Sequence, residues 1–352
     1  SLGIFYTAFT QLLGFPHYGD EYKIMGLAPY GKPLYVDKLQ DVVQLIPGGL
    51  FKLNLSYFRS PGKGYVAYSD DNIPKHPNAF GNKAEAIFGK QRLKDEPLSQ
   101  YHKDLAASVQ RMAELAIFHC LDYLYQKTNL KAVCIAGGVA QNSVANGKIL
   151  SNTPFKKIYI PSAGHDAGIS MGAAQYVYYN QLKQSRTSPI FSAYTGASFS
   201  NEYIENMLQA RGISYRKLKD EHLLPYVVSK LINAAVVGWF NGKAEFGPRA
   251  LGGRSILADP TRQDAKDIIN SKIKRRESFR PFAPSILKEH VSDFFEIDDI
   301  VPFMEKVYLI REEKRQLIPA VTHADGTGRL QTVDAAISPR YHALIQYFFQ
   351  QT

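Results

Sequence analysis

Two arginines framed by glycines are the residues of this sequence best suited to chemistry. Arg249 and Arg254 lie in the stretch EFGPRALGGRSILADP, residues 245–260. A guanidinium group can hold phosphate or carboxylate oxygens with two hydrogen bonds, and a glycine such as Gly247 lets the backbone come close to a ligand. The stretch therefore predicts a pocket for a strongly anionic ligand.

Further cations follow in the run KIKRRESFRPFAP, residues 272–284, where Lys274 and Arg280 flank a segment that its prolines stiffen. Such a preorganised cluster would neutralise a phosphate leaving group. Taken alone, a basic run is more often the solvated end of a helix. The glycine-framed arginines before it favour the binding interpretation.

A third stretch, THADGTGRLQTV at residues 322–333, reads as a loop. Arg329 within it is a candidate third clamp on the anion, because its guanidinium group can also bind two oxygens. His323 and Asp325 are candidates to orient it.

Charge and length limit the kind of partner. The 352 residues carry a net charge of +10, and one core usually covers fewer residues, so we expect two domains and an anionic ligand. The cations are mixed with acidic residues except near residues 272–280. This favours a pocket over a nucleic-acid-binding stripe.

The two cysteines, Cys120 and Cys134, are predicted core residues without a disulfide, which is typical of a reducing compartment. No apolar run approaches the roughly 18 residues of a membrane span, and no signal peptide opens the chain. We expect a cytoplasmic protein that does not enter a membrane. A leader before Ser1 stays an open alternative.

Helical periodicity dominates the first half. Residues 1–13 and, more strongly, 103–126 show apolar positions three and four apart. Between them, residues 19–33 are expected to form an irregular loop. This loop either brings backbone N–H groups to a ligand or is an ordinary turn. We also expect some strand alternation within 51–67 and a surface connection at 68–97.

A strand at 132–136 stops at Gly137 and Gly138, and a helix carrying Asn142 and Asn146 follows. Strand, glycine turn and helix in this order point backbone donors and a helix N-terminus at a ligand beyond the strand. Proteins often hold a phosphate or a nucleoside in this way.

The pattern repeats with a strand at 157–161, the loop SAGHDAG at 162–168 and a helix at 169–179. Asp166 lies between the end of the strand and the start of the helix, and its carboxylate is expected to face the same cleft as the glycine turn. Its carboxylate could hold a divalent metal or cap the helix, and capping is the commoner role. The adjacent His165 more often would not be a ligand.

A polar, aperiodic segment at 181–191 marks the expected boundary between a domain at 1–184 and one at 185–352. The elements predicted after it are a strand at 213–218, a helix at 223–234 and a buried strand at 235–240. That last strand leads directly into the glycine-framed arginines.

The chain resembles the nodulation-type O-carbamoyltransferases. GDEYKIMGLAPYG, AGGVAQNSVANG and PSAGHDAGISMGAA carry the likeness in the first half, and FGPRALGGRSILADP, KIKRRESFRPFAPS and THADGTGRLQTV carry it in the second. It covers nearly all of residues 1–335. The resemblance implies an α/β chain: part of a sugar-kinase/actin-like domain, as in the tRNA threonylcarbamoyltransferases, followed by a threonylcarbamoyladenylate-synthase-like domain.

The resemblance also implies a two-step reaction. In the second domain, carbamoyl phosphate and ATP, accompanied by Mg²⁺, would give carbamoyladenylate and pyrophosphate. In the first domain, a site with a divalent metal, Fe²⁺ in the family, would move the carbamoyl group to a hydroxyl of a small-molecule acceptor such as a sugar or secondary metabolite. A metal suits this step because it can stabilise negative charge on the carbonyl oxygen. A homodimer is an open alternative to a monomer.

Residue roles carry over by the same resemblance. The residues expected to hold carbamoyl phosphate and the ATP phosphates are Arg249, Lys274, Arg280 and Arg329, with Arg254, Gly247 and His323 in support. The residues expected near the adenylate are Gly137, Gly138, Asn142 and Asn146. Asp166 matches the family's metal-binding aspartate.

The chain departs from the family at both ends. Nothing matches the family's opening GxxHDxSA-like motif, its HxxxH-type pair of metal-binding histidines or its closing NTSFN-like loop. We therefore expect a fragment that transfers carbamoyl groups poorly or not at all, with its other metal ligands elsewhere. Two alternatives stay open: a threonylcarbamoyl-type tRNA-modifying enzyme and a non-catalytic nucleotide-binding module.

Overall fold

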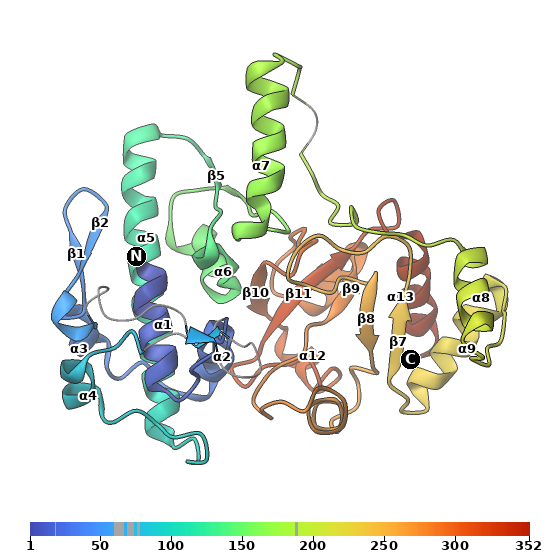
Figure 1. Cartoon of the computed structure of the whole chain (residues 1–352), viewed down its shortest axis with the longest axis horizontal. Helices are drawn as coiled ribbons and strands as arrows, with labels where there is room; N and C mark the ends of the chain where they lie inside the picture. Colours follow the sequence, from blue (N-terminus) through green and yellow to red (C-terminus); the bar gives the residue numbers. More distant parts are fainter. Residues whose placement is uncertain (18, 60–66, 69–73, 76–77, 187–188) are drawn as a thin grey trace. The chain divides into compact units, whose positions relative to one another are not determined.

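The computed structural model describes the chain except for residues 18, 60–66, 69–73, 76–77 and 187–188. Contacts divide it into two compact units: Ser1–Tyr159 with His323–Asp325, and Ile160–Thr322 with Gly326–Thr352. Both units combine helices with small sheets (Figure 1), so the expected α/β class is confirmed. The domain boundary at residue 184 and the finer fold assignment stay predictions.

The first unit contains helices and short strands. Its helices are α1 (Leu2–Leu12), α2 (Glu21–Leu27), α3 (Val36–Gln40), α4 (Asn82–Phe88), α5 (Gln100–Thr128) and α6 (Ser143–Asn152). Its strands are β1 (Val43–Ile46), β2 (Leu50–Leu53), β3 (Ala67–Tyr68), β4 (Pro74–Lys75), β5 (Ala132–Cys134) and β6 (Lys157–Tyr159).

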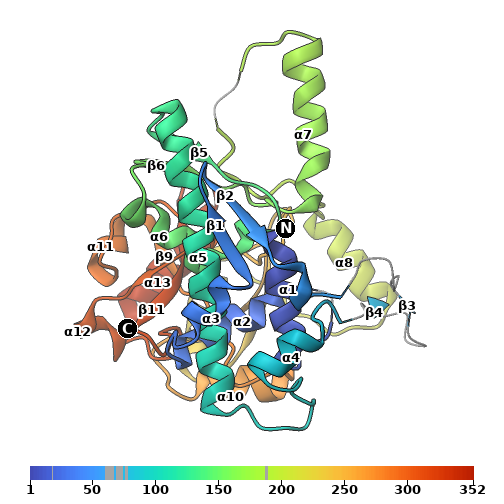
Figure 2. The same cartoon turned by 90° about the vertical axis from the view of Figure 1, so that its left-hand side faces the viewer.

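Helix α5 is the centre of this unit and confirms the helix predicted at 103–126. The apolar residues three and four apart, including Leu105, Val109 and Met112, are fully buried. Helices α1, α2, α3 and α6 pack against α5, and the antiparallel β1–β2 hairpin lies beside it (Figure 2). The amphipathic pattern therefore buries one face under most of the unit.

Two predictions for the first half were wrong. Residues 19–33 are not an irregular loop, because α2 and a 3₁₀ turn, Ala28–Tyr30, occupy most of them. A Cβ on Gly31 would lie 2.1 Å from the carbonyl oxygen of Lys103, so this glycine allows close packing against α5. The connection expected at 68–97 contains α4 in its described part.

Strands β5 and β6 form the predicted repeat and pair in parallel. Their core includes Val133, Ile149 and Phe155. Both cysteines are free, but Cys134 is exposed and Cys120 only half-buried, so the expectation that both are core residues was wrong. The short sheet leaves one face of β5 open.

The second unit holds the arginine-rich stretches. Its helices are α7 (Ile169–Tyr176), α8 (Asn201–Ala210), α9 (Asp220–Ile232), α10 (Ala265–Ile268), α11 (Val291–Phe294), α12 (Glu312–Arg315) and α13 (Pro339–Gln351). Its strands are β7 (Val237–Phe240), β8 (Arg254–Leu257), β9 (Ser285–Leu287), β10 (Lys306–Leu309) and β11 (Thr327–Val333).

Strand β11 is the central strand of the sheet β10–β11–β9 (Figure 1), antiparallel to β10 and parallel to β9. A separate antiparallel pair, β7–β8, brackets the loop that carries Arg249. Helices α9 and α13 pack together over a core that includes Trp239 and Val333. Within the described residues, no helix has the length and apolar character to cross a bilayer.

The structure confirms the helix predicted at 223–234, now α9, and the one at 169–179, now α7 with a π-helical turn, Val177–Gln181. The strand predicted at 213–218 is wrong, because these residues form no strand. Strand β7 exists, but only Trp239 of it is buried. The loop predicted at 322–333 is also wrong over its second half, which is β11.

Candidate active site

The loop between β7 and β8 folds around the carboxylate of Glu245. Glu245 Oε1 accepts hydrogen bonds from the backbone N–H groups of Leu251 at 2.6 Å, Gly253 at 2.8 Å and Arg254 at 3.2 Å. One acidic side chain thus fixes the path of the segment that carries Arg249. This role of Glu245 was missed from sequence, where the only signal is an acidic residue that opens a glycine-rich stretch.

Glycines of this loop allow close contact with other parts of the second unit. Gly252 has φ +105°, and a Cβ there would lie 2.3 Å from the Tyr341 ring. Gly247 has φ +145°, and its Cβ would lie 2.5 Å from the carbonyl oxygen of Ser162. Both conformations favour glycine. These close approaches are made to the protein itself, so a ligand contact at Gly247 stays a prediction.

Arg254 clasps the loop. Its Nη1 donates to the carbonyl oxygens of Asn241 and Gly253, and its Nη2 donates to those of Ala197 and Gly242. Its guanidinium also lies over the Phe240 ring, 3.5 Å from the centroid. Since these contacts use both terminal nitrogens, Arg254 holds the loop, and its contact with a phosphate stays a prediction.

Arg249 lies within electrostatic reach of two guanidinium groups from other segments, those of Arg280 and Arg329. Burial lowers the pKa of Arg249, and the charge of Arg280 lowers it further. Burial also lowers the pKa of Arg329, well below its usual range, and the charge of Arg249 adds to this. Arg249 Nε is buried and, among the described residues, has no hydrogen-bond partner. A crowded, partly unsatisfied cation cluster of this kind suits an anionic ligand.

Arg329 projects from the middle of β11 and not from a loop as expected. Its Nε donates to the carbonyl oxygen of Met304 at 2.7 Å. Met304 has φ +56°, an uncommon value for a residue with a side chain, in the turn before β10. The turn between α11 and β10 therefore supports Arg329 through the backbone.

Glu305 follows Met304 and places a carboxyl group beside the cations. Its Oε2 accepts a hydrogen bond from the N–H of Phe303 at 2.8 Å. Burial raises the pKa of Glu305 to about 7, although the charge of Lys306 opposes the shift. The charge of Glu305 in turn raises the pKa of Arg329, against the effect of burial. Sequence reasoning missed this residue because it lies outside the three motif stretches.

The segment with Lys274 and Arg280 is organised by a buried asparagine. Asn270 Nδ2 donates to the carbonyl oxygen of Arg280 at 3.1 Å, and Asn270 Oδ1 accepts from Arg276 Nε at 2.6 Å. Arg280 Nη1 lies 3.6 Å from a Glu277 oxygen. Burial lowers the pKa of Lys274, and Arg276 and Arg280 lower it further. Asn270 therefore shapes the second cation group, a role the sequence analysis missed.

Asp166 lies at the start of a 3₁₀ turn, Asp166–Gly168, and is exposed. The Nδ1 atom of the adjacent His165 is buried and, in the described part of the chain, has no hydrogen-bond partner. Yet no three His, Cys, Asp or Glu side chains of the described residues gather into a metal-binding group. These two residues do not make a complete metal site by themselves, and we derive no step through a metal ion.

In the first unit, the glycine turn after β5 is open. Gly137 has φ +106°, and a Cβ built on Gly137 or Gly138 meets no described atom within 4 Å. Asn146, buried on α6, donates from Nδ2 to the carbonyl oxygen of Ala140 at 2.8 Å. Asn146 therefore fixes the turn through this hydrogen bond, and its contact with an adenylate stays a prediction.

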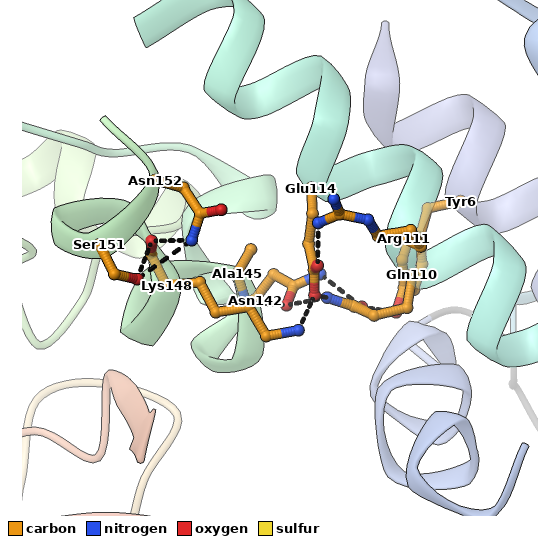
Figure 3. A network of polar contacts seen from close by, with 9 residues as sticks. All are labelled: Tyr6, Gln110, Arg111, Glu114, Asn142, Ala145, Lys148, Ser151 and Asn152. Carbon is orange, nitrogen blue, oxygen red and sulfur yellow. Dashed lines mark hydrogen bonds and ion pairs between the residues drawn. The ribbon is translucent and has the colours of Figure 1, made fainter. Parts of the chain in front are cut away.

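Asn142 is the N-cap of α6 and is held by Gln110 of α5 (Figure 3). Its Oδ1 accepts from the N–H of Ala145 at 3.0 Å and from Gln110 Nε2 at 3.1 Å, and its Nδ2 donates to Gln110 Oε1 at 2.9 Å. The OH of Tyr6 also donates to Gln110 Oε1, at 2.8 Å. The side chain of Asn142 is thus engaged within the protein, and it positions α6 against α5.

A buried carboxylate anchors the same network (Figure 3). Glu114 is only 1% exposed, and its Oε1 lies 2.7 Å from Lys148 Nζ and 3.0 Å from Gln110 Nε2. Arg111 Nη1 lies 3.3 Å from the other oxygen. A buried charge needs such partners. The network fixes the helices on either side of the glycine turn.

His323 and Asp325 group with the first unit, whereas Arg329 belongs to the second. The prediction that His323 and Asp325 orient Arg329 therefore stays a prediction.

Comparisons with known proteins cover both halves of the chain. The family model "Carbamoyltransferase N-terminus" matches residues 1–175, and the family model "Carbamoyltransferase C-terminus" matches residues 228–352. Together they include the glycine turn, Asp166 and all four cations expected to bind phosphate.

Similar proteins align with the whole chain. The nodulation protein NolNO of Sinorhizobium fredii is 39% identical over 100% of this chain and 49% of its own length. The nodulation protein NolO of Bradyrhizobium diazoefficiens is 38% identical over 100% of this chain and 61% of its own length. The uncharacterized protein sll1178 of Synechocystis sp. is 40% identical over 99% of this chain and 59% of its own length. The chain thus spans about half to three fifths of the length of these relatives.

Proposed function

Because the chain belongs to the carbamoyltransferase family, we propose that it is part of an O-carbamoyltransferase that uses carbamoyl phosphate and ATP. Its second unit would form carbamoyladenylate in two steps: water cleaves carbamoyl phosphate to carbamate and inorganic phosphate, and a carbamate oxygen then attacks the α-phosphorus of ATP, which releases pyrophosphate. Its first unit would pass the carbamoyl group to a hydroxyl of a small-molecule acceptor. The observation that carries the proposal is the cluster of Arg249, Arg280 and Arg329.

The physical basis is charge repulsion that a ligand relieves. The pKa values of Arg249 and Arg329 are lowered by burial and by the neighbouring cations, so this group of cations is electrostatically unfavourable by itself. A phosphate group brings negative charge and several acceptor oxygens, and each guanidinium can bind two of these. Lys274, whose pKa the same neighbours lower, would complete the set.

The two substrates place different demands on this cluster. Carbamoyl phosphate would be held by Arg249 and Arg329, the most buried pair. The phosphates of ATP, with Mg²⁺, would extend toward Lys274 and Arg280, which are on a more accessible segment. Preorganised cations would stabilise the negative charge that develops on the leaving pyrophosphate.

In the first unit, the glycine turn offers backbone N–H groups at the end of β5, and Gln110, Asn142 and Asn146 hold it in place. We propose that this turn receives the adenylate. Asp166 belongs to the second unit and stays the proposed ligand of a divalent metal such as Fe²⁺.

The acceptor is proposed only as a small molecule with a hydroxyl group, such as a sugar or secondary metabolite. Two of the relatives are nodulation proteins by name.

The test is exchange of labelled pyrophosphate into ATP, measured with and without carbamoyl phosphate. We expect exchange that depends on carbamoyl phosphate. Arg249→Ala should reduce it at least about 100-fold, because a buried cation that faces the phosphate is lost. The matched control is Arg211→Ala, an exposed arginine at the end of α8, which should leave exchange unchanged.

Two results would contradict the proposal. Full exchange in the Arg249 variant would show that the site is elsewhere. Binding of ATP without any exchange would favour the non-catalytic nucleotide-binding module.

A further inference from the structure

A row of polar side chains in the first unit leads from a buried carboxylate to the glycine turn (Figure 3). Glu114 and Gln110, both on α5, are only 1% and 4% exposed. Asn142, at the other end of the row, closes the 3₁₀ turn Gly138–Gln141 and is also the N-cap of α6. The carboxylate and the glycine turn are therefore linked through two side-chain amides.

The two amides form a pair that does not by itself fix their orientation. Gln110 Nε2 donates to Asn142 Oδ1 at 3.1 Å, and Asn142 Nδ2 donates to Gln110 Oε1 at 2.9 Å. If both amides were turned over, each oxygen would again face a nitrogen, and the pair would form two equivalent hydrogen bonds. The orientation must therefore come from the groups at the two ends of the pair.

Each end of the pair fits only one orientation. Glu114 Oε1 lies 3.0 Å from Gln110 Nε2, and a carboxylate only accepts, so it requires the nitrogen of Gln110 on its side. The N–H of Ala145 lies 3.0 Å from Asn142 Oδ1 and only donates, so it requires the oxygen of Asn142. The Tyr6 hydroxyl, 2.8 Å from Gln110 Oε1, can donate or accept and would fit either orientation.

The fixed orientation leaves a hydrogen-bond donor at the end of the glycine turn. Asn142 Nδ2 carries two hydrogens, and Gln110 Oε1 is its one acceptor among the described residues. Asn142 is half-buried, and a Cβ on Gly138, at the start of the same turn, would meet no described atom within 4 Å. The turn therefore has room for a ligand and a second amide hydrogen to offer it.

We propose that Gln110 is a positioning residue for the adenylate: held by Glu114, it orients Asn142 so that the second amide hydrogen donates to a phosphate oxygen of the ligand. This inference rests on the proposed function, in which the glycine turn receives the adenylate. In the reversed orientation, Asn142 would turn its oxygen toward the ligand and repel the phosphate. Gln110 itself does not touch the ligand and acts through Asn142.

A simpler role for the network is to hold helices together. Tyr6 belongs to α1, Gln110 to α5 and Asn142 to α6, so the same hydrogen bonds stabilise the packing of three helices. A purely structural network predicts that each variant loses ligand affinity in proportion to the stability that it loses. Orientation of Asn142 predicts that affinity depends on Gln110 far more than on Tyr6.

The experiment is calorimetric titration of the chain with AMP, with thermal denaturation of every variant. Gly138→Leu, which fills the open space at the turn, should abolish AMP binding. Gln110→Met should raise the Kd of AMP at least about tenfold, because both hydrogen bonds to Asn142 are lost. Tyr6→Phe should lower the melting temperature but keep the Kd within about twofold. Gln126→Met, an exposed control on the same helix, should change neither quantity.

A double variant tests whether Gln110 acts through Asn142. In the Asn142→Ala chain, Gln110→Met should change the Kd of AMP by less than about twofold, because the side chain that it orients is absent. Gln110→Glu keeps the shape of the side chain but has no amide hydrogens to donate. It should weaken AMP binding as Gln110→Met does, and it serves as the test if the methionine variant does not fold.

An unchanged Kd in the Gln110 variants, or the same loss of affinity with and without Asn142, overturns the positioning role while the adenylate site stands. The same conclusion follows if Tyr6→Phe weakens AMP binding as much as Gln110→Met does. If AMP does not bind, or if Gly138→Leu binds it as before, the glycine turn is not the adenylate site. That part of the proposed function then fails, and the inference fails with it.

Discussion

The carboxylate of Glu245 shows how a single residue can determine the shape of the loop that carries Arg249. Its Oε1 atom accepts three backbone N–H groups within a segment that would otherwise have few internal hydrogen bonds. The cationic side chain of Arg249 depends on that shape. The most important acidic residue of the loop is thus one that need not touch the ligand.

Replacing Glu245 with alanine should leave three partly buried backbone donors without their acceptor. We expect the free energy of unfolding to fall by about 2 to 4 kcal/mol, since each unmade hydrogen bond carries a desolvation cost. Urea denaturation measures the loss, and calorimetric titration should show weaker carbamoyl phosphate binding. Glu221→Ala, at an exposed site, should change neither quantity. Unchanged stability in the Glu245 variant would contradict this role.

Glu305 should make stability depend on pH. Its folded pKa of about 7 lies above the usual value of 4.5, so the folded chain binds a proton that the unfolded chain releases. This stabilisation is complete below about pH 4.5 and is lost as pH rises through 7. Among the charged groups near Glu305, Lys306 favours the carboxylate and Asp299 disfavours it. Arg329, whose pKa the charge of Glu305 raises, is a further cation near it.

We therefore expect Glu305→Gln to become more stable relative to the unaltered protein as pH rises from 5 to 8, by up to about 3 kcal/mol. Denaturation curves at several pH values measure this difference. A difference that stays constant over this range would show that Glu305 titrates normally.

At the scale of elements, close packing between the arginine-bearing loop and α13 depends on a glycine. Gly252 has a positive φ, and a Cβ there would meet the buried ring of Tyr341. Because Tyr341 belongs to the core between α9 and α13, it has little room to move.

Gly252→Ala should therefore destabilise the protein by about 2 kcal/mol or more and weaken carbamoyl phosphate binding, because overpacking and backbone strain add. Thermal denaturation and titration measure the two effects. Gly238→Ala on β7 is the matched control: a Cβ there meets no described atom within 4 Å, so its melting temperature should change little. A Gly252 variant that behaves like this control would refute the packing argument.

Elements with a long internal pattern could be predicted from sequence, and short ones could not. Helix α5 repeats its apolar spacing over many turns, so one face had to be buried. Residues 213–218 alternate like a strand, but a strand also needs a partner for its backbone. There the side chains of Tyr215 and Lys217 bond to Glu205 of α8, and no described strand pairs with the segment.

At the scale of the whole molecule, binding of a ligand to one unit should increase the measured stability of the protein. A ligand that binds only the folded state raises the free energy of unfolding, by about 2.7 kcal/mol at a concentration 100 times its Kd. Carbamoyl phosphate should therefore raise the melting temperature by several degrees. Arg249→Ala should lose most of this shift, and Arg211→Ala should keep it. An equal shift in both variants would place the binding site elsewhere.

The sequence by itself determined the family, the α/β class, the long helix α5 and the strand–glycine–helix order around Gly137. Local spacing and recurring residue motifs carry these features. It also predicts that Arg249 and Arg329 bind an anionic ligand, but it wrongly places Arg329 in a loop.

Only the tertiary structure decided which polar groups meet. Arg329 lies on a strand, and the side chains of Arg254 and Asn142 form hydrogen bonds within the protein. Glu245 and Glu305 accept backbone hydrogen bonds that were not predicted from sequence. The physical reason is that these contacts join segments far apart in the chain, as the hydrogen bond between Gln331 and Leu251 does across 80 positions. Spacing along a sequence predicts which face of an element is buried, but not which distant residue forms a hydrogen bond with it.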